Sequence, residues 1–577
     1  MVLKTNMRII YITDLVISIK VHKQSAITDR NLTHTPIALS TTTYITIYMT
    51  TIIRMQRLVK RYRIQIEMIT LTLFAAILRL FELERRVFHH DEAAVGHFTY
   101  RLFTEGVYSY NPAFHGPFLY YTTSSIYSIL GDTIFSSRLL PAIFGVLMVP
   151  LVFLLRDRLG RRGTIIAAFF FAISPSFLYY SRFFRNDIFV AFFMLAAVIC
   201  IPKYSDQKRL FFVAGAGIFI GLSAAAKENT YIYIAIFTSY LILTYLIDLL
   251  SRILKKHPTK DPLQPLKTIK KEYQGIITIL TSFLVVYALF YTDFFSNPQG
   301  FTRSFESAIT HWYNMHTTER VGGPPYFYIP ILLLYELPIV LFAAIGSLQT
   351  LKRPDRFKRF LLYWTLTSLA AYSYLGEKVP WLTIHILLPM ILLASTTLNE
   401  TLQEDQKNNP RTREILIAVF ITTTLLLTLA SLQLNYQNYT NPAEPLIQAA
   451  QPPQRFQEML NKIDEVADQW EKYNTTIQVT DTAIETQLLW YLRDYRNIKW
   501  RVNLDSELNA PLIIAHDRDA PKIQKKLENH YQRLDSAKMN WYRFKTSDIT
   551  PEYILWREMT RPPDEYGIVL FYRYPAE

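Results

Sequence analysis

Two adjacent carboxylates, Asp91 and Glu92, are the first residues in this sequence that could do chemistry. They follow an apolar run at about 66–83, and His90 stands directly before them. A carboxylate in such a place can take a proton from a hydroxyl group, or orient a metal ion that activates one. The neighbouring histidines leave a divalent metal open, although their spacing matches no specific metal site. An ordinary solvated helix end is the alternative.

A polar tripeptide, His115-Gly116-Pro117, ends the loop that the two carboxylates begin. Proline suits the first turn of a helix, and glycine lets the backbone approach another group closely. His115 could therefore orient a carboxylate or hydrogen-bond a phosphate, so we include it among the candidate catalytic residues. A plain helix start is the alternative.

Three cationic side chains further along the chain are candidate phosphate contacts: Arg182, Arg185 and Lys227. The two arginines are three positions apart, so on a helical turn they would share a face. Guanidinium groups bind phosphate through two parallel hydrogen bonds, and a lysine acts as a point charge. Snorkelling of the arginines at the membrane interface, and a self-paired turn of Lys227 with Glu228, are the alternatives.

Glu336 stands inside the apolar stretch LLLYELPIVLF, about ten residues into an expected helix and therefore roughly at mid-membrane. An ionisable residue at that depth is a functional hypothesis, and a neutral hydrogen-bonded carboxyl group is the alternative. Pro338 could kink the helix there. The remaining polar candidates are Asp187, Glu228, His311, Glu377 and Lys378, and ordinary loop polarity is the alternative for the last three.

Membrane-spanning helices must position these groups, because half of the 577 residues are hydrophobic and the mean hydropathy is positive. Several apolar runs reach the roughly 17–25 residues that cross a bilayer. We predict a polytopic α-helical membrane protein with about eleven transmembrane helices. The expected spans are 66–83, 139–156, 164–180, 187–202, 210–226, 231–249, 275–292, 326–348, 359–375, 382–398 and 414–434.

The loops between these helices predict the orientation of the chain. Basic loops such as 156–163 and 251–271 alternate with loops that carry the polar candidates, as the positive-inside rule requires. The net charge of +14 therefore needs no nucleic acid partner. We expect a cytoplasmic N-terminus and polar candidates on the outer face. The run 117–130 is too short to span and suits an interfacial or re-entrant helix.

The composition divides the chain into three parts. Residues 1–54 are Thr-rich without a clean period, which we interpret as a poorly ordered extension from an upstream start, with an amphipathic leader as the alternative. Residues 55–434 hold the transmembrane domain, with its first outer loop at 84–138. Residues 435–577 alternate strand and helix patterns, which predicts an extracytoplasmic α/β domain. Its core should bury Trp490, Leu492 and Ile513, without disulfides, because Cys200 is the one cysteine.

Taken together, the acidic pair, the HGP tripeptide, the short apolar segment and RLLPAIFG (138–145) resemble the GT-C glycosyltransferases. The first half is most similar to the dolichyl-phosphate-mannose-protein mannosyltransferase and aminoarabinose-transferase branch. With SRFFRND (181–187), GEKVPWL (376–382) and WYLRD (490–494), the set resembles archaeal flippase-activity-associated proteins of the N-glycosylation pathway. The similarity covers about Arg79 to Leu398 and, more loosely, the tail.

This resemblance implies an outward-facing site that takes a sugar from polyprenyl or dolichyl phosphate. It places the base at Asp91, with Glu92 beside it, and the phosphate contacts around Arg182, Arg185 and Lys227. The chain departs from the protein mannosyltransferases in having no three-lobed sugar-binding insert and a different tail, so the resemblance does not define the acceptor. Our hypothesis is a hydroxyl group on a lipid-linked glycan or a protein. The alternative function is a non-enzymatic protein that helps a lipid-linked glycan cross the membrane.

Overall fold

The structure is a computed structural model that describes residues 62–254, 273–318, 323–352, 355–403, 410–447, 450–527, 530–535, 539–540, 550–559 and 565–575. The expected extension 1–54 lies outside the described residues, as does most of the loop 251–271. The chain divides into two compact units, 1–66 and 67–577, and the features described below belong to the second unit.

Helices dominate this unit up to residue 437. Residues 67–80 are helical. The α-helices that follow are α3 (His90–Glu105), α4 (Phe118–Leu130), α5 (Ile134–Val152), α6 (Arg156–Ile173), α7 (Pro175–Ser181), α8 (Asp187–Gln207), α9 (Leu210–Ala226), α10 (Asn229–Leu254), α12 (Tyr273–Tyr291), α13 (Gly300–Thr318), α14 (Tyr328–Tyr335), α15 (Leu337–Lys352), α16 (Arg356–Tyr374), α17 (Thr383–Gln403) and α18 (Pro410–Leu432). Short helical turns lie at η1 (Pro112–Phe114), η2 (Phe153–Leu155), η3 (Pro380–Leu382) and η4 (Gln433–Gln437).

By length and composition, six helical stretches among the described residues could cross a membrane, or seven if a bent pair counts as one span. They are Ile134–Ile173, Asp187–Gln207, Asn229–Ser251, Tyr273–Tyr291, Pro380–Gln403 and Pro410–Gln437. The first of these contains both α5 and α6, which pack against each other. The expected span 210–226 is the 17-residue α9, slightly shorter than the hydrocarbon core. The polytopic helical character is therefore established, whereas the count of eleven spans stays a prediction.

The expected continuous span 326–348 is broken in the structure. It consists of α14 and α15, which meet at Glu336 with a bend of 110°. Pro338 sits in the first turn of α15, where a proline needs no backbone N–H and cannot continue the preceding helix. Glu336 therefore lies at a helix break, not inside a continuous helix as the sequence had suggested.

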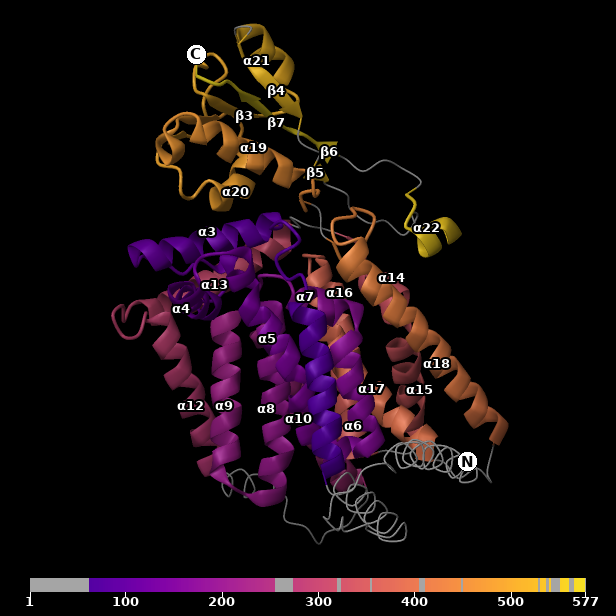
Figure 1. Cartoon of the computed structure of the whole chain (residues 1–577). Helices are drawn as coiled ribbons and strands as arrows, with labels where there is room; N and C mark the ends of the chain where they lie inside the picture. Colours follow the sequence, from indigo (N-terminus) through magenta and orange to yellow (C-terminus); the bar gives the residue numbers. More distant parts are fainter. Residues whose placement is uncertain are drawn as a thin grey trace, which may run out of the picture. The chain divides into compact units, whose positions relative to one another are not determined.

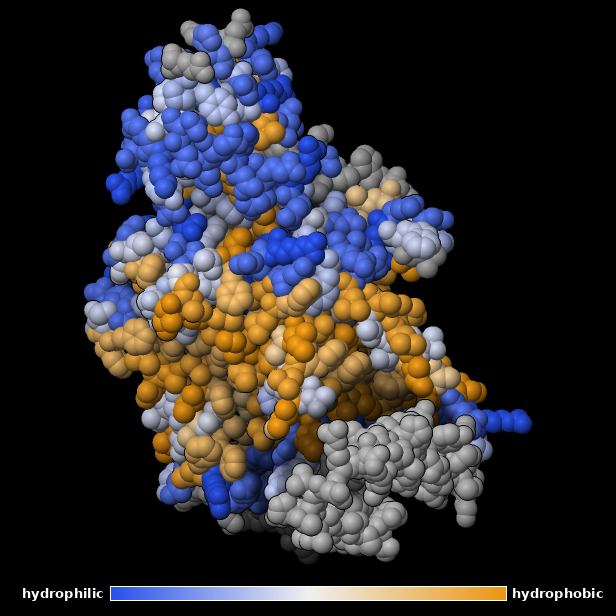
Figure 2. Space-filling model, viewed as in Figure 1, coloured by the Kyte–Doolittle hydropathy of each residue, from blue (hydrophilic) through white to orange (hydrophobic). Residues whose placement is uncertain are grey.

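The long helices run side by side, with α3, α4 and α13 at one end of the bundle (Figure 1). Apolar residues cover the bundle on the face that Figure 2 shows. α17 is its central helix, because its most apolar window is entirely buried inside the protein. A charged or polar residue on α17 therefore has to be paired within the protein, which matters for His385 below.

A five-stranded mixed sheet follows the last long helix. Its order is β2-β1-β3-β7-β4, with β1 parallel to β2 and β3, and β7 antiparallel to β3 and β4. The strands are β1 (Ile477–Val479), β2 (Ile498–Lys499), β3 (Leu512–His516), β4 (Gln532–Asp535) and β7 (Ile568–Tyr572), with β5 (Met539–Asn540) and β6 (Glu565–Tyr566) forming a separate pair. The accompanying helices are α19 (Phe456–Asp468), α20 (Thr482–Tyr491), α21 (Ala520–Lys526) and α22 (Pro551–Trp556), with a short turn at η5 (Lys472–Asn474).

The three residues expected in the core of this C-terminal part are all buried, although they do not share one core. Leu492 and Ile513 belong to two clusters around the sheet. Trp490 instead packs against Phe88, with ring centroids 5.2 Å apart, in the cluster formed mainly by the helical bundle. A side chain on Gly96 of α3 would meet the Trp490 ring at 2.8 Å, so this glycine lets α20 dock on α3.

Candidate functional site

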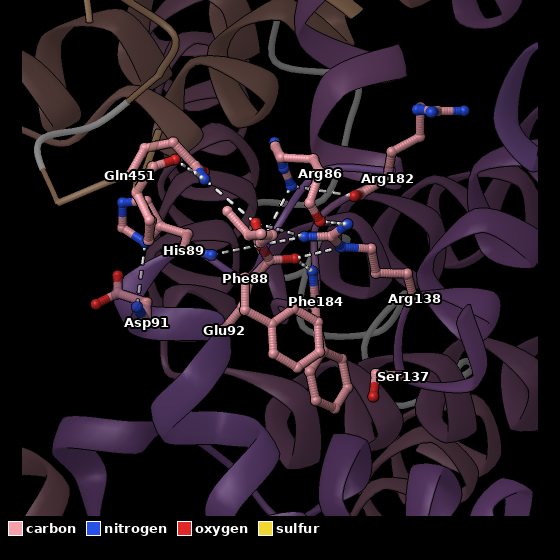
Figure 3. Close-up of polar contacts among 12 residues, drawn as sticks. Arg86, Phe88, His89, Asp91, Glu92, Ser137, Arg138, Arg182, Phe184 and Gln451 are labelled. Atoms are coloured by element: carbon pink, nitrogen blue, oxygen red, sulfur yellow. Dashed lines mark hydrogen bonds and ion pairs between the residues drawn. The ribbon is translucent and has the colours of Figure 1, made fainter. Parts of the chain in front are cut away.

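The N-terminus of α3 directs the two adjacent carboxylates to different places. The ring Nδ1 of His89 accepts a hydrogen bond from the backbone N–H of Asp91 at 3.1 Å, and the Glu92 carboxylate accepts one from the backbone N–H of His89 at 3.0 Å. These reciprocal contacts form a capping box, with histidine in the place usually taken by serine or threonine. Glu92 turns into the protein and Asp91 turns away from it (Figure 3).

Glu92 is completely buried among hydrogen-bond donors. Arg138 donates to both of its oxygens, at 2.8 and 2.7 Å, and Arg86 donates at 3.2 Å. The backbone N–H of Phe184 adds a bond of 2.7 Å to that from His89. Burial alone would raise the pKa of Glu92, but the two guanidinium groups outweigh it and lower the pKa to about 2. The carboxylate is therefore ionised, and it holds the start of α3 in place.

Arg138 also organises the loop that precedes α3. Its guanidinium donates to the backbone carbonyls of Leu83, Arg86 and Val87 at 3.1, 2.7 and 3.3 Å. Arg138 was not singled out from the sequence as a site residue. A charged residue five positions into the apolar helix α5 is the signal that could have found it.

Arg182 caps a helix and does not join Arg185. The five residues between α7 and α8 are not helical, so the two arginines do not share a helical face. The Arg182 guanidinium donates, at 2.7–3.0 Å, to the carbonyls of Leu78, Arg79, Phe81 and Glu82, at and just beyond the end of the helix 67–80. The adjoining cavity measures about 20 Å³, which is room for about one water molecule and too little for a phosphate group.

Asp91, Arg185 and His115 form the first part of a second cluster. The Asp91 side chain is 30% exposed, and its carboxylate forms an ion pair with Arg185. A second Arg185 nitrogen lies 3.2 Å from Nε2 of His115, and the guanidinium sits over the Trp381 ring at 3.9 Å from its centroid. These three elements, α3, the loop before α8 and the turn η3, thus meet around one guanidinium.

His115 connects this cluster to Glu228. Its Nδ1 lies 3.1 Å from Glu228, which also accepts a bond of 2.7 Å from the Tyr110 hydroxyl. Burial, and then the charge of Lys227, lower the pKa of His115 below 6.5, so the imidazole is neutral at pH 7. Its partners assign the tautomer, because the carboxylate only accepts and the guanidinium only donates. Nδ1 carries the hydrogen and Nε2 accepts from Arg185.

Gly116 is required because the chain passes very close to the end of α9. A Cβ on Gly116 would lie 2.1 Å from the carbonyl oxygen of Ala225, and the Gly116 N–H donates to Ala226 at 3.1 Å. This contact brings His115 next to Lys227 and Glu228, which follow Ala226 directly. The tripeptide is thus more than a helix start.

Lys227 belongs to a buried ion pair beside the same tryptophan. Its ammonium donates to Asp187 at 2.7 Å and lies 6.0 Å from the Trp381 ring centroid. The same Asp187 oxygen lies 3.1 Å from Nε2 of His385, whose Nδ1 is 3.0 Å from the Tyr233 hydroxyl. The Asp187 carboxylate therefore fixes the position of the Lys227 ammonium. His385 on the central helix α17 in turn contacts this carboxylate.

The buried Glu336 carboxylate has hydrogen-bond partners at the start of α7. Its carboxylate accepts hydrogen bonds from the Ser174 hydroxyl at 2.8 Å and from the backbone N–H of Ser176 at 3.0 Å. It thus bridges the break between α14 and α15 to the beginning of α7. No contact described for Glu336 connects it to the Asp91–Arg185 cluster, so the structure does not bring this predicted site residue to the others.

The remaining candidates are Lys378, His311 and Glu377. The Lys378 ammonium donates to the carbonyl oxygens of Tyr372 at 3.3 Å and of Leu375. His311 packs its ring edge-on against Trp312, with centroids 5.0 Å apart, and Trp312 in turn stacks on His115 at 6.0 Å. Glu377, like Lys378, lies in the loop between α16 and η3.

A metal ion finds no ready set of ligands in the described part of the chain. There, no three His, Cys, Asp or Glu side chains gather in a geometry that could hold one. His90, which the sequence suggested as a supporting residue, donates its backbone N–H to the carbonyl of Ala450 at 3.3 Å.

Sequence reasoning did not single out several residues that complete the site. They are Arg86, Tyr110, Arg138, Tyr233, Trp381 and His385. Trp381 belongs to the motif GEKVPWL (376–382), from which the sequence analysis selects only the two charged residues. Tyr110 and His385 carry no local signal. They matter because they contact Glu228 and Asp187, which are more than 100 residues away in the chain.

The helical fold of this chain is shared with solved structures of other proteins. The solved structure of ArnT from Cupriavidus metallidurans bound to undecaprenyl phosphate aligns with a TM-score of 0.56 and 12% identity, over 87% of this chain and 97% of that chain. The apo state of the same protein aligns equally well.

A further solved structure and a family model each resemble part of the chain. The apo Archaeoglobus fulgidus oligosaccharyltransferase aligns with a TM-score of 0.49 and 16% identity, over 77% of this chain and 65% of that chain. A family model described as dolichyl-phosphate-mannose-protein mannosyltransferase matches residues 114–257, which include His115, Arg185 and Lys227 but not Asp91. No curated protein matches the chain.

Proposed function

We propose that this protein is a membrane glycosyltransferase that moves a sugar from a polyprenyl-phosphate donor to a hydroxyl group of a lipid-linked glycan or protein. The observation that carries the proposal is the partly exposed Asp91 carboxylate, ion-paired with Arg185 and close to His115. The GT-C fold supports it. So does the undecaprenyl phosphate named for the ArnT structure, because that ligand is the leaving group such a donor would release.

Asp91 acts as the general base. The acceptor oxygen attacks the anomeric carbon of the donor sugar and forms the new glycosidic bond, while the hydroxyl proton passes to Asp91. The bond between that carbon and the phosphate oxygen breaks, and polyprenyl phosphate leaves with the electron pair. Attack from the opposite face inverts the anomeric configuration. A positioned base of this kind typically contributes about 10²–10⁴-fold to the rate.

Arg185 and Lys227 receive the phosphate. A guanidinium binds phosphate more strongly in a bidentate pair than through a single contact. Donor binding would therefore draw Arg185 away from Asp91 and leave the carboxylate to the acceptor. The centroid of the Trp381 ring lies 3.9 Å from the Arg185 guanidinium and 6.0 Å from the Lys227 ammonium. His115 contacts Arg185, and Asp187 accepts a hydrogen bond from Lys227, so both cations are held in place. Arg182, whose donors are engaged by carbonyls, takes no part in this step.

Glu92 serves the same reaction by holding α3, and therefore Asp91, against the bundle. We assign it a positioning role, since the structure surrounds its carboxylate with donors and buries it completely. His90, Glu336, Glu377 and Lys378 stay predictions as supporting residues, and the step described above uses none of them directly.

The orientation and the finer family assignment are part of the proposal. We place the N-terminus in the cytoplasm and residues 435–577 outside, above the site. The motifs DE (91–92), HGP (115–117) and SRFFRND (181–187) support a relation to the archaeal flippase-activity-associated proteins of N-glycosylation. The competing role, non-enzymatic help in moving a lipid-linked glycan, would need the cationic residues but not the base.

The test is turnover by purified protein. Mannose and glucose linked to polyprenyl phosphate are supplied together with a membrane extract as the source of acceptor, and release of polyprenyl phosphate is measured. We expect Asp91→Asn to lower turnover by about 10²–10⁴-fold. Glu105→Gln, at the exposed end of the same helix, is the matched control. Unchanged turnover in Asp91→Asn refutes the assignment of the base, and no release by the wild type favours the non-enzymatic role.

A further inference from the structure

A polar cleft in the C-terminal part takes no part in the chemistry described above. It lies between α19 and the turn that follows α20, and its volume is about 380 Å³. This is within the range of about 300–1,000 Å³ that is typical of small-molecule sites. Its lining side chains include Asp464, Asp468, Lys472, Tyr473, Asp494 and Tyr495.

One wall of the cleft is a single face of α19. Gln457, Asp464 and Asp468 are seven and four positions apart, so they lie along one side of this helix. The opposite wall is formed by Tyr491 at the end of α20 and by the turn 492–495 that follows it.

The groups in the cleft suit a polyhydroxylated ring. The Asp464 carboxylate accepts a bond of 2.7 Å from the buried Tyr495 hydroxyl, which fixes its position. The Tyr473 ring packs edge-on against Tyr495, with centroids 5.7 Å apart, and is 46% exposed. Sugar hydroxyl groups donate to carboxylates, and the apolar face of a sugar ring packs on an aromatic ring.

The charge of the cleft argues against a phosphate ligand. Three aspartates line it, and the Arg493 guanidinium is engaged elsewhere, with Asp132 at 2.7 Å and with the Trp490 carbonyl. Lys472 is the cation that remains, and its ammonium sits 5.2 Å from the centroid of the Tyr473 ring. A neutral glycan satisfies this mixture of acceptors and one donor, whereas an anionic headgroup would be repelled.

The cleft is also placed along the helix that carries the proposed base. The Tyr491 hydroxyl, at one edge of the cleft, accepts a bond of 2.7 Å from the backbone N–H of Phe88. The Tyr100 hydroxyl on α3 reaches Asp494 at 3.5 Å. Tyr100 is nine residues from Asp91, which is about 14 Å along the helix axis. A glycan that presents its terminal hydroxyl to Asp91 could therefore place more distant sugar units in the cleft.

We propose that this cleft binds sugar units of a neutral glycan acceptor. The inference rests on the proposed glycosyltransferase function and names the acceptor class: the acceptor is a glycan chain, held some distance from the reacting hydroxyl. The cleft then determines which acceptors are used without touching the reacting atoms.

The test is direct binding to the full-length protein in detergent. Saturation-transfer NMR is recorded with two probes, α-mannotriose and N,N′-diacetylchitobiose, and with tetralysine for comparison. We expect at least one saccharide to bind. The double variant Asp468→Asn and Tyr473→Ala should bind that saccharide with an affinity at least tenfold lower. Both positions are exposed, so folding should be retained, and a thermal melt confirms it. Asp505→Asn, an exposed aspartate away from the cleft, is the control.

The outcomes separate the two proposals. Asp91→Asn should bind the saccharide as the wild type does, because Asp91 lies outside the cleft. A wild-type protein that binds the saccharide but transfers no sugar refutes the enzyme and retains the cleft as a glycan-binding site. Binding that is equal in the wild type and the double variant overturns the cleft. So does a failure of both saccharides to bind, or binding of tetralysine in their place.

Discussion

Replacing Glu92 by glutamine tests the buried anchor of α3. The substitution keeps the shape of the side chain but leaves Arg138 and Arg86 without their buried counter-charge. The pKa of Glu92 in the folded protein is about 2, compared with 4.5 for an ordinary glutamate. This difference corresponds to about 3 kcal/mol of stability at pH 7. Breaking a buried ion pair by removing one partner usually costs about 3–5 kcal/mol, which agrees.

This contribution should depend on pH in a defined way. Because folding lowers the pKa of Glu92, its contribution is complete above about pH 4.5 and disappears as the pH falls towards about 2. Between pH 4.5 and pH 2, the free energy of unfolding of the wild type should therefore fall by about 3 kcal/mol more than that of Glu92→Gln. The deficit of the variant should be large at pH 7 and small near pH 2.

The assay is unfolding of detergent-solubilised protein by increasing SDS, followed by tryptophan fluorescence. Glu105→Gln, on the same helix but exposed and paired only with Arg101, is the matched control and should cost under about 1 kcal/mol. Adding Arg138→Met to Glu92→Gln should cost less than the sum of the two single changes, because the two side chains are in contact. A Glu92→Gln protein as stable as the control would refute the anchor.

Two further predictions concern the arginines and the orientation. Arg182→Leu should lower stability by about 3 kcal/mol or more, because four carbonyls lose their donor, and should leave the KM for the polyprenyl-phosphate donor unchanged. Arg185→Leu should instead raise that KM about 10–100-fold, and the opposite pattern would show that the two roles are exchanged. In a Cys200→Ser background, Gln469→Cys should react with an impermeant maleimide on intact cells and Lys260→Cys should not. Labelling of position 260 would contradict the proposed orientation.

The sequence by itself determined the class of protein and the pool of candidate groups. Apolar runs of spanning length depend only on local composition, so the polytopic helical character could be predicted without any contact. Short motifs also indicated Asp91, His115 and Lys227, whose roles stay proposals.

Only the tertiary structure decided which contacts each member of a pair makes. Asp91 and Glu92 are neighbours in sequence, yet Arg138, 46 residues after Glu92, buries one and not the other. Arg182 and Arg185 are equivalent in composition, but the end of the helix 67–80 occupies Arg182 and leaves Arg185 to Asp91. Local patterns cannot show this, because the partner that buries or orients a charge lies far away in the chain. For the same reason, Trp381 and His385 became site residues only when α17 was packed at the centre of the bundle.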